Sequence, residues 1–378
     1  MVYAYTVGPE GSNKKIKPKR SPKWIFLAVF FFLVLAGVSF GTGILIAEKF
    51  PSLNNYFHFG GAKRVEIKAE SQPIAENKAE PEVNAVQKEE PPENAIDQNQ
   101  SAEVSPVPEP VKFTFAVMGD TQYFKPGTNG GYQIAASSIK KINPNLVFGV
   151  GDLVSSCDGG SECEAKFNGW KSVLGSFGSK AYVMQGNHDR TGKDKADAVW
   201  EKIFSYLPGN GPQGFVKFAY SFDFENSHFV VLDSEKPKEH EVNSTQRDWL
   251  ERDLSVNKKE NTFVFFHEPA YPVSSKINES LDVEAGERNA LWNILTAHKV
   301  TAVFSGHEHI HSRRKINGVY QFVFGNTDSF DHDMPKAGMA EYAYRGQNFG
   351  IVKMEDKKIT VEVYSVNGKL LNSVTFSK

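Results

Sequence analysis

The feature that most restricts the fold of this chain is an arrangement that occurs five times between residues 113 and 309. Each time, a short apolar run of four to six residues ends in a polar cluster that could bind a metal ion. Near-continuous apolar runs of this kind are typical of strands buried on both faces, so residues 111–378 predict an α/β head. The runs are Phe113–Met118, Leu146–Val150, Ala181–Met184, Thr262–Phe266 and Val300–Phe304.

The polar clusters all lie at the carboxyl ends of the predicted strands, where ligands of such sheets gather. One cluster alone is a weak signal, because Gly-Asp is a common turn and a lone histidine is more often a satisfied core residue. His307 and His309 are two residues apart, so on a strand they would share a face. Together the clusters indicate a metal site. They are Gly119-Asp120-Thr121-Gln122, Gly151-Asp152, Gly186-Asn187-His188-Asp189, His267-Glu268-Pro269 and Gly306-His307-Glu308-His309.

In this order the clusters resemble the calcineurin-like metallophosphoesterase superfamily, which includes purple acid phosphatases and cyclic-nucleotide phosphodiesterases. The family pattern is Asp-x-His, Gly-Asp, Gly-Asn-His-Asp/Glu, a lone His and Gly-His-x-His. The resemblance implies a four-layer α/β sandwich with two facing mixed sheets. It also implies metal-dependent hydrolysis of phosphoric mono- or diesters.

The resemblance further implies two divalent or trivalent metal ions bridged by the carboxylate of Asp152. A mixed set of carboxylate, imidazole and amide ligands suits Mn, Fe or Zn better than it suits Ca or Mg, which prefer sites made of oxygen ligands alone. Such an ion pair would convert a bridging water into hydroxide, which would attack phosphorus. The ligands expected on either side of Asp152 are Asp120, Gln122 and His309 in the first metal site and Asn187, His267 and His307 in the second.

His188 is expected to be catalytic, either stabilising the developing charge or protonating the leaving oxygen, with Asp189 orienting its ring. Gln122 stands where the common family pattern has a histidine, and its amide oxygen is a weaker ligand. Ser155 stands where purple acid phosphatases have a metal-binding tyrosine, so a coloured iron–tyrosinate centre is not expected.

Cys157 and Cys163 are the only two cysteines of the chain. We expect a disulfide that rigidifies the rim of the site, with two free thiols or a soft-metal clip as alternatives. Further strands are predicted at 320–324, 349–354, 359–365 and 370–376, with Asn367-Gly368 as a hairpin turn, and we expect them to finish the second sheet. Residues 326–347 are expected to form a loop near the site.

The run from Trp24 to Ala47 has no charged side chain and is long enough to span a bilayer as a helix. A cleaved signal peptide and a buried core helix are the alternatives, but the run is too long for the first and has no large domain around it for the second. The basic tail, residues 1–23, predicts a cytoplasmic N-terminus and therefore an extracytoplasmic head. Residues 48–110 are rich in Pro and Glu and predict a disordered linker.

The sequence thus predicts a membrane-anchored, extracytoplasmic phosphoesterase that acts on phosphate-ester substrates. A decayed, tethered interaction module is the alternative, supported only by Gln122. Nucleic-acid binding is not expected, because the chain has a net charge of −2 and a nuclease would use a basic groove.

Overall fold

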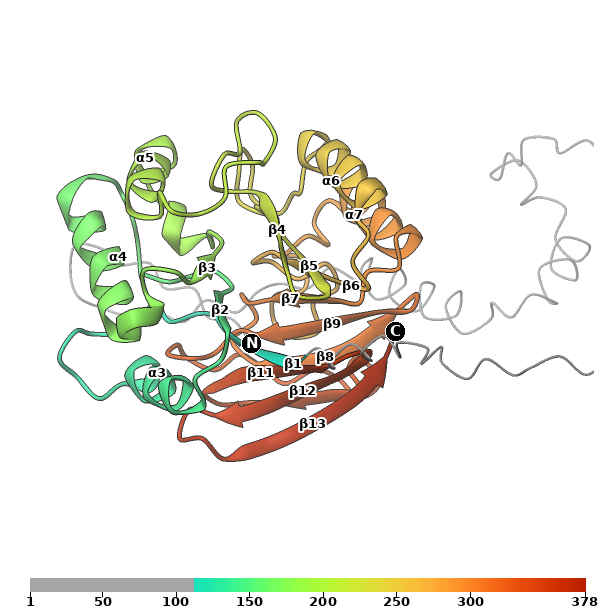
Figure 1. Ribbon diagram of the computed structural model, residues 1–378. Coiled ribbons are helices and arrows are strands. Elements are labelled where there is room, and N and C mark those ends of the chain that lie inside the picture. Colours follow the sequence, from blue (N-terminus) through green and yellow to red (C-terminus); the bar gives the residue numbers. More distant parts are fainter. Residues whose placement is uncertain (1–111) are drawn as a thin grey trace, which may run out of the picture. The chain divides into compact units, whose positions relative to one another are not determined.

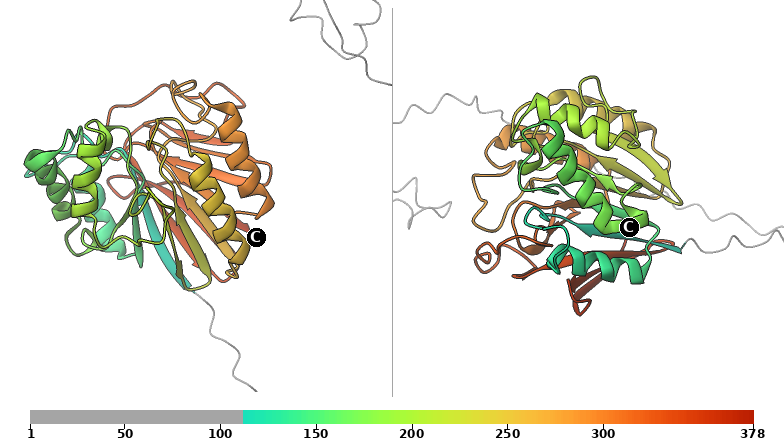
Figure 2. Two further views of the ribbon diagram at one scale, coloured as in Figure 1. Left: turned by 90° about the horizontal axis from the view of Figure 1, so that it is seen from above. Right: turned by 90° about the vertical axis from the view of Figure 1, so that its left-hand side faces the viewer.

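The computed structural model of the protein describes residues 112–378. The predicted cytoplasmic tail, transmembrane helix and linker lie outside these residues. Within the part that is described, no helix is both long and apolar enough to cross a bilayer. The described residues form two mixed β-sheets with helices on both flanks, as Figures 1 and 2 show.

The first sheet has six strands in the order β13-β12-β11-β1-β2-β3. β1, β2 and β3 run parallel, whereas β11, β12 and β13 form an antiparallel extension on the other side of β1. The strands are β1 (Lys112–Met118), β2 (Leu146–Gly149), β3 (Tyr182–Val183), β11 (Asn348–Glu355), β12 (Lys358–Ser365) and β13 (Leu370–Ser377).

The second sheet has seven strands in the order β10-β8-β9-β7-β6-β5-β4. β5, β6, β7 and β9 run parallel. β4 and β8 flank them in the antiparallel direction, and β10 pairs antiparallel with the outer edge of β8. The strands are β4 (Tyr220–Phe224), β5 (Ser227–Val231), β6 (Asn261–Phe265), β7 (Ala302–Ser305), β8 (His311–Ile316), β9 (Val319–Phe324) and β10 (Tyr342–Tyr344).

An aromatic core joins the two sheets face to face. The ring of Phe148 on β2 stacks on that of Phe265 on β6 with centroids 4.1 Å apart, and Phe115 on β1 meets Phe263 on β6 edge to face at 5.2 Å. Burying large rings in such contacts is a major source of core stability. The helices that flank the sheets are α3 (Gly131–Ile142), α4 (Gly160–Leu174) and α5 (Asp194–Ile203) on one side and α6 (Ser244–Val256) and α7 (Ala285–Ala297) on the other (Figure 2).

The structure confirms the five predicted strands, which become β1, β2, β3, β6 and β7, and it confirms the last hairpin as β12–β13. The expectation that the C-terminal strands finish the second sheet is wrong for three of the four. Only β9 joins that sheet, whereas β11 pairs with the edge of β1 that β2 leaves open, and β12 and β13 follow it. β8 was not predicted, because Arg313, Arg314 and Lys315 interrupt its apolar pattern.

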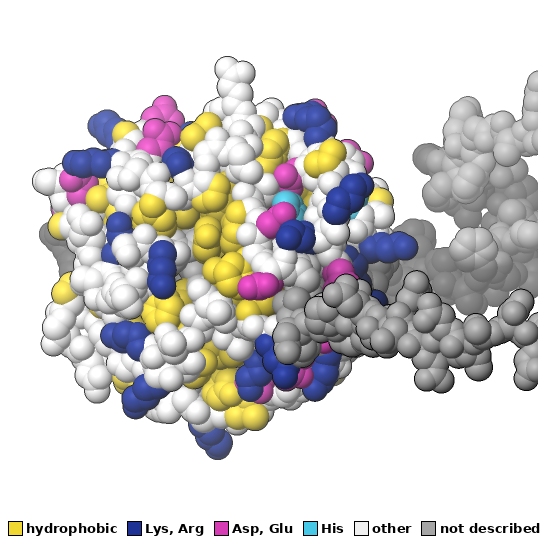
Figure 3. All heavy atoms as spheres, viewed as in Figure 1, with side chains coloured by type: hydrophobic (Ala, Val, Ile, Leu, Met, Phe, Trp, Pro, Cys, Tyr) yellow, Lys and Arg dark blue, Asp and Glu magenta, His cyan; other side chains and the backbone are white. Residues whose placement is uncertain are grey.

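Basic and acidic side chains are interspersed over the face of the molecule that Figure 3 shows. This face of the described residues therefore has no continuous basic stripe of the kind that follows a nucleic-acid backbone.

Candidate metal centre

The seven predicted metal ligands lie together at the carboxyl ends of five parallel strands, in the loops that follow β1, β2, β3, β6 and β7. Within each sheet, backbone hydrogen bonds hold neighbouring loops against one another. The amide of Asp120 donates to the carbonyl of Gly151 at 3.0 Å, and the amide of Gly306 donates to the carbonyl of His267 at 2.9 Å.

Four of the seven residues have a left-handed backbone. The φ angles are 53° at Asp120, 51° at Asp152, 67° at His307 and 49° at His309. Non-glycine residues rarely adopt this conformation, which costs about 1–3 kcal/mol each and tends to occur at functional sites. His307 and His309 accordingly lie in a turn between β7 and β8. The expectation that they share one face of a strand is therefore wrong.

Two glycines allow the carboxylates to approach the neighbouring loops. A β-carbon on Gly186 would lie 2.2 Å from Oδ1 of Asp152, and one on Gly306 would lie 2.5 Å from Oδ2 of Asp120. Real β-carbons do not come this close, so any other residue would displace a carboxylate. This requirement explains why each of the two clusters begins with glycine.

The first group of ligands surrounds Asp120. Its Oδ1 lies 3.2 Å from Nε2 of His309, and ligand atoms of Asp120, Asp152 and His309 all lie within 4.8 Å of one another. The amide nitrogen of Gln122 lies 3.1 Å from the same Nε2, and its buried Oε1 has no hydrogen-bond partner. Because rotation of the amide exchanges its two ends, this unpaired oxygen can take the position beside His309. Gln122 thus offers an oxygen ligand here.

In the second group, Asn187 Oδ1 lies 3.3 Å from Nε2 of His267 and 3.1 Å from Nδ1 of His307. His267 Nδ1 donates to the carbonyl of Val150 at 2.8 Å, and His307 Nε2 donates to the carbonyl of Glu279 at 2.7 Å. The nitrogen left to face Asn187 is then Nε2 in His267 and Nδ1 in His307, each of which has a lone pair when its ring carries a single proton. They point their lone pairs at an amide oxygen.

The charges of this site favour a cation. Burial lowers the pKa of His307 well below 6.5, and lowers that of His309 to about 4, so both rings are neutral. Burial raises the pKa of Asp120, and the nearby charge of Asp152 raises it further, although His267 lowers it. His267 Nε2 also lies 3.5 Å from Oδ1 of Asp152. A bound cation would relieve the repulsion between the two neighbouring carboxylates. Carboxylate, amide and imidazole groups that converge in this way are the ligands of metal sites, so these residues fit bound metal ions.

His188 lies at the rim of the site. Its side chain is 36% exposed, and Nε2 lies 4.0 Å from Oδ2 of Asp152. Its Nδ1 donates to the carbonyl of Ser155 at 2.8 Å. This bond fixes the ring with Nε2 facing the site.

Asp189 does not orient the ring of His188, and that expectation is corrected. Its Oδ2 accepts the amides of Leu153 and Gly186 at 3.1 and 3.0 Å, and its Oδ1 accepts the amide of Val154 at 3.0 Å. Burial raises the pKa of Asp189 well above its ordinary value and the nearby charge of Asp152 raises it further, although these amides lower it in part. Asp189 thus ties the loop that carries Asp152 to the loop that carries Asn187.

The loop after β9 contributes residues that the sequence did not single out. Ser329 Oγ lies 3.0 Å from Nδ1 of His309. The ring of His332 stacks on that of His309 at 4.1 Å, and Phe330 packs on its edge at 4.7 Å. The expected loop near the site is thus confirmed, but its contacts were not predictable, because residues 326–347 show no period or motif.

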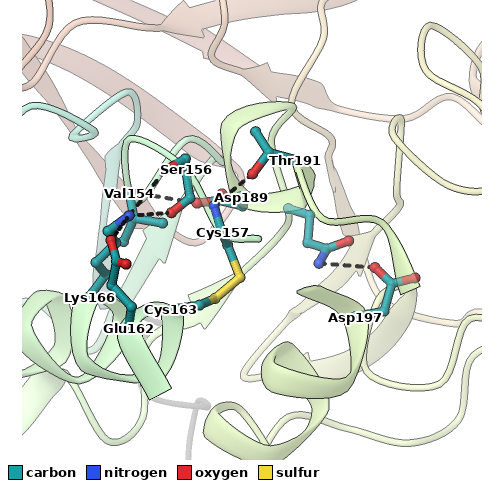
Figure 4. The surroundings of a disulfide bond; sticks show 10 residues. Val154, Ser156, Cys157, Glu162, Cys163, Lys166, Asp189, Thr191 and Asp197 are labelled. Atoms are coloured by element: carbon teal, nitrogen blue, oxygen red, sulfur yellow. Dashed lines mark hydrogen bonds and ion pairs between the residues drawn. A yellow bond between two sulfur atoms is a disulfide. The ribbon is translucent and has the colours of Figure 1, made fainter. Parts of the chain in front are cut away.

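The expected disulfide is also confirmed. Cys157, in the loop after β2, is bonded to Cys163 in the first turns of α4 (Figure 4). The amide of Cys157 donates to Oγ1 of Thr191 at 2.9 Å, which ties the same loop to the segment after His188. The disulfide therefore stiffens the rim beside Asp152.

Comparison with known proteins agrees with this geometry. Tartrate-resistant acid phosphatase type 5 of Sus scrofa is 23% identical over 222 residues, which cover 50% of this chain and 62% of that protein. The protein of the same name from Rattus norvegicus is 25% identical over 217 residues, which cover 50% and 64%. The chain thus spans less than two thirds of the length of these relatives.

Solved structures share the fold. A purple acid phosphatase from yellow lupin (Lupinus luteus) has a TM-score of 0.57 at 16% identity, covering 71% of this chain and 54% of that chain. GAP50, described as the anchor in the inner membrane complex of Plasmodium, has a TM-score of 0.52 at 17% identity, covering 70% and 89%. Residues 113–311, more than half of the chain, match the model of the Calcineurin-like phosphoesterase family. The protein therefore belongs to the calcineurin-like phosphoesterase family.

Proposed function

We propose that this protein is a metal-dependent hydrolase of phosphoric mono- or diesters, anchored in a membrane by residues 24–47 with its head outside the cytoplasm. The observation that carries the proposal is the convergence of carboxylates and imidazole nitrogens on one buried site. The tartrate-resistant acid phosphatases to which the chain is similar support the same reaction class.

Asp152 would serve both metal ions, because it contacts His267 and also lies in the group with Asp120 and His309. Bound Mn, Fe or Zn ions would supply Lewis acidity toward the phosphoryl oxygens and would acidify a water molecule. The other ligands of the two ions would be Gln122 with Asp120 and His309, and Asn187 with His267 and His307.

His188 would handle the proton of the leaving group. Since its Nδ1 is held by the carbonyl of Ser155, only Nε2 is available to the substrate. Nε2 faces the site beside Asp152 and its side chain reaches solvent. A protonated Nε2 can donate to the leaving oxygen of a phosphoryl group, which is general-acid catalysis.

The extracytoplasmic location rests on two features. The charge-free run from Trp24 to Ala47 follows a tail with six basic residues, and such tails stay cytoplasmic. The disulfide between Cys157 and Cys163 is of a kind that persists in oxidising compartments. A test is accessibility of the head to protease added outside intact cells.

The activity is tested with the full chain in detergent, stripped of metal and reloaded with Mn, Fe or Zn. Turnover of a chromogenic monoester or diester should depend on metal and should vanish in Asp152→Asn. Asp158→Asn is the matched control, because Asp158 is exposed in the same loop, and it should retain activity and metal. Wild-type protein that binds well under two ions per chain and turns over neither ester would favour the interaction-module alternative. The alternative is supported by the similar fold of GAP50, which is described as an anchor.

A further inference from the structure

A cavity of about 300 Å³ lies beside the candidate metal centre. Three segments form its walls: the loop after β1, the loop after β2 and the first two turns of α4. The lining residues are Gln122, Phe124, Pro126, Val154, Ser155, Glu162, Ala165 and Lys166.

Two of the lining residues of the cavity also contact residues of the site. The amide of Gln122 lies 3.1 Å from Nε2 of His309, and the carbonyl of Ser155 holds Nδ1 of His188 at 2.8 Å. A group in this cavity is therefore next to both the first set of metal ligands and the proposed general acid. One substrate could therefore have its phosphoryl group at the metal centre and its organic group in the cavity, with the ester oxygen joining the two.

The walls are held in place before any ligand binds. Phe124 packs edge to face on Tyr132 of α3 with centroids 5.3 Å apart. Phe124 and Pro126 also lie against Gly169 of α4, at 3.6–3.9 Å from the position of a β-carbon there. The disulfide fastens the loop after β2 to the same helix (Figure 4). Preformed cavities cost little ordering entropy on binding.

The chemistry of the lining selects an uncharged, apolar group. Phe124, Pro126, Val154 and Ala165 give apolar walls. Lys166, the one cation among the described lining residues, already donates to the carbonyl and the hydroxyl of Ser156 at 3.0 and 3.1 Å. It also pairs with Glu162 at 3.1 Å. A second phosphate group in the cavity would therefore lie beside a lysine that is already hydrogen-bonded and beside the carboxylate of Glu162. An aromatic ring would instead contact the apolar walls.

We propose that this cavity binds the organic group of the substrate, and that the preferred substrates are phosphate esters of an aromatic or similarly compact apolar alcohol. The proposal rests on the proposed phosphoesterase function, because it names the substrate class of that site. It excludes a chain of further phosphates as the group next to the scissile bond.

The test is to fill the cavity from an exposed position. Ala165 is exposed on α4, lines the cavity and is not one of the predicted metal ligands, so Ala165→Phe fills the cavity without replacing a ligand. Ser172→Phe adds the same ring at an exposed position of α4 outside the cavity and is the matched control. The ratio of kcat/KM for 1-naphthyl phosphate to kcat/KM for ethyl phosphate should fall at least about tenfold in Ala165→Phe, the discrimination expected of a hydrophobic pocket. It should not change in Ser172→Phe.

A binding measurement separates this proposal from the proposed function. Calorimetric titration of the metal-loaded full chain should show tighter binding of benzylphosphonate than of methylphosphonate, and Ala165→Phe should remove the difference. Selective binding without turnover of any ester would support the cavity and refute the hydrolase. Turnover with equal affinity for the two phosphonates would overturn the cavity and leave the hydrolase standing.

A third variant tests an aromatic pair outside the cavity, one member of which is next to Gln122 in the sequence. Tyr123 and Phe330 form this exposed pair, with ring centroids 5.8 Å apart. If Phe330→Ala removes the preference for benzylphosphonate and Ala165→Phe does not, the organic group lies on that pair and the proposal is wrong.

Discussion

Replacing Asp189 by Asn distinguishes two roles for this buried residue. In the structure its two carboxylate oxygens accept three backbone amides, from Leu153, Val154 and Gly186. An asparagine of the same shape has only one oxygen. In its better orientation that oxygen keeps the two amides on the Oδ2 side, and its NH₂ group then points at the amide of Val154.

The substitution therefore loses one hydrogen bond to a charged group and weakens the other two. A hydrogen bond to a charged group contributes about 1.5–3 kcal/mol. We expect a loss of about 3 kcal/mol in the free energy of unfolding, which lowers Tm by about 6–10 °C in a domain of this size. Because Asp189 joins the loops of Asp152 and Asn187, metal affinity should fall as well.

The assay is thermal unfolding followed by near-ultraviolet circular dichroism, with metal content measured by mass spectrometry on the same full-chain samples. Asp194→Asn is the control, since the carboxylate of Asp194 is fully exposed, and such surface changes stay within about 0.5 kcal/mol. If Asp189→Asn lowers kcat while Tm and metal content stay at the wild-type values, Asp189 acts on His188, and the reasoning is refuted.

Three further predictions concern other parts of the head. Replacing both Cys157 and Cys163 by Ser should cost about 2 kcal/mol, the loop-closure entropy of so short a loop, in denaturant unfolding; unchanged stability relative to wild type would contradict this. Gly186→Ala should abolish metal binding in a titration, because the new β-carbon would lie 2.2 Å from Oδ1 of Asp152; retained affinity would show that the loop can shift. Burial lowers the pKa of His228, but hydrogen bonds to two aspartates outweigh this and raise it above 6.5. That stabilisation is complete below the unfolded pKa and is lost as the pH rises through the folded pKa, so His228→Gln should destabilise more at about pH 5.5 than at about pH 8.5. Equal destabilisation at the two pH values would be inconsistent with an ion pair.

The sequence alone determined the elements whose signal is local. Five apolar runs became five parallel strands, and the polar cluster after each run lies where parallel strands end. Asn367-Gly368 predicted the turn of the last hairpin, since this pair favours the backbone that a tight hairpin needs. The candidate ligands were predictable for the same reason, because each is defined by its immediate neighbours in the chain.

Only the tertiary structure decided which distant segments pair. Nothing within β11 indicates that it joins β1 in place of the second sheet, because apolar strands of similar pattern fit either edge. The position of Asp189 next to His188 in the sequence suggests that the two side chains interact. In the structure its carboxylate instead binds the amides of Leu153 and Val154, which are more than thirty residues away in sequence. Ser329 and His332 likewise contact His309 from a loop without any motif. Local spacing sets the period and chemistry of a segment, whereas its partners depend on which edges and amides the folded chain leaves unpaired.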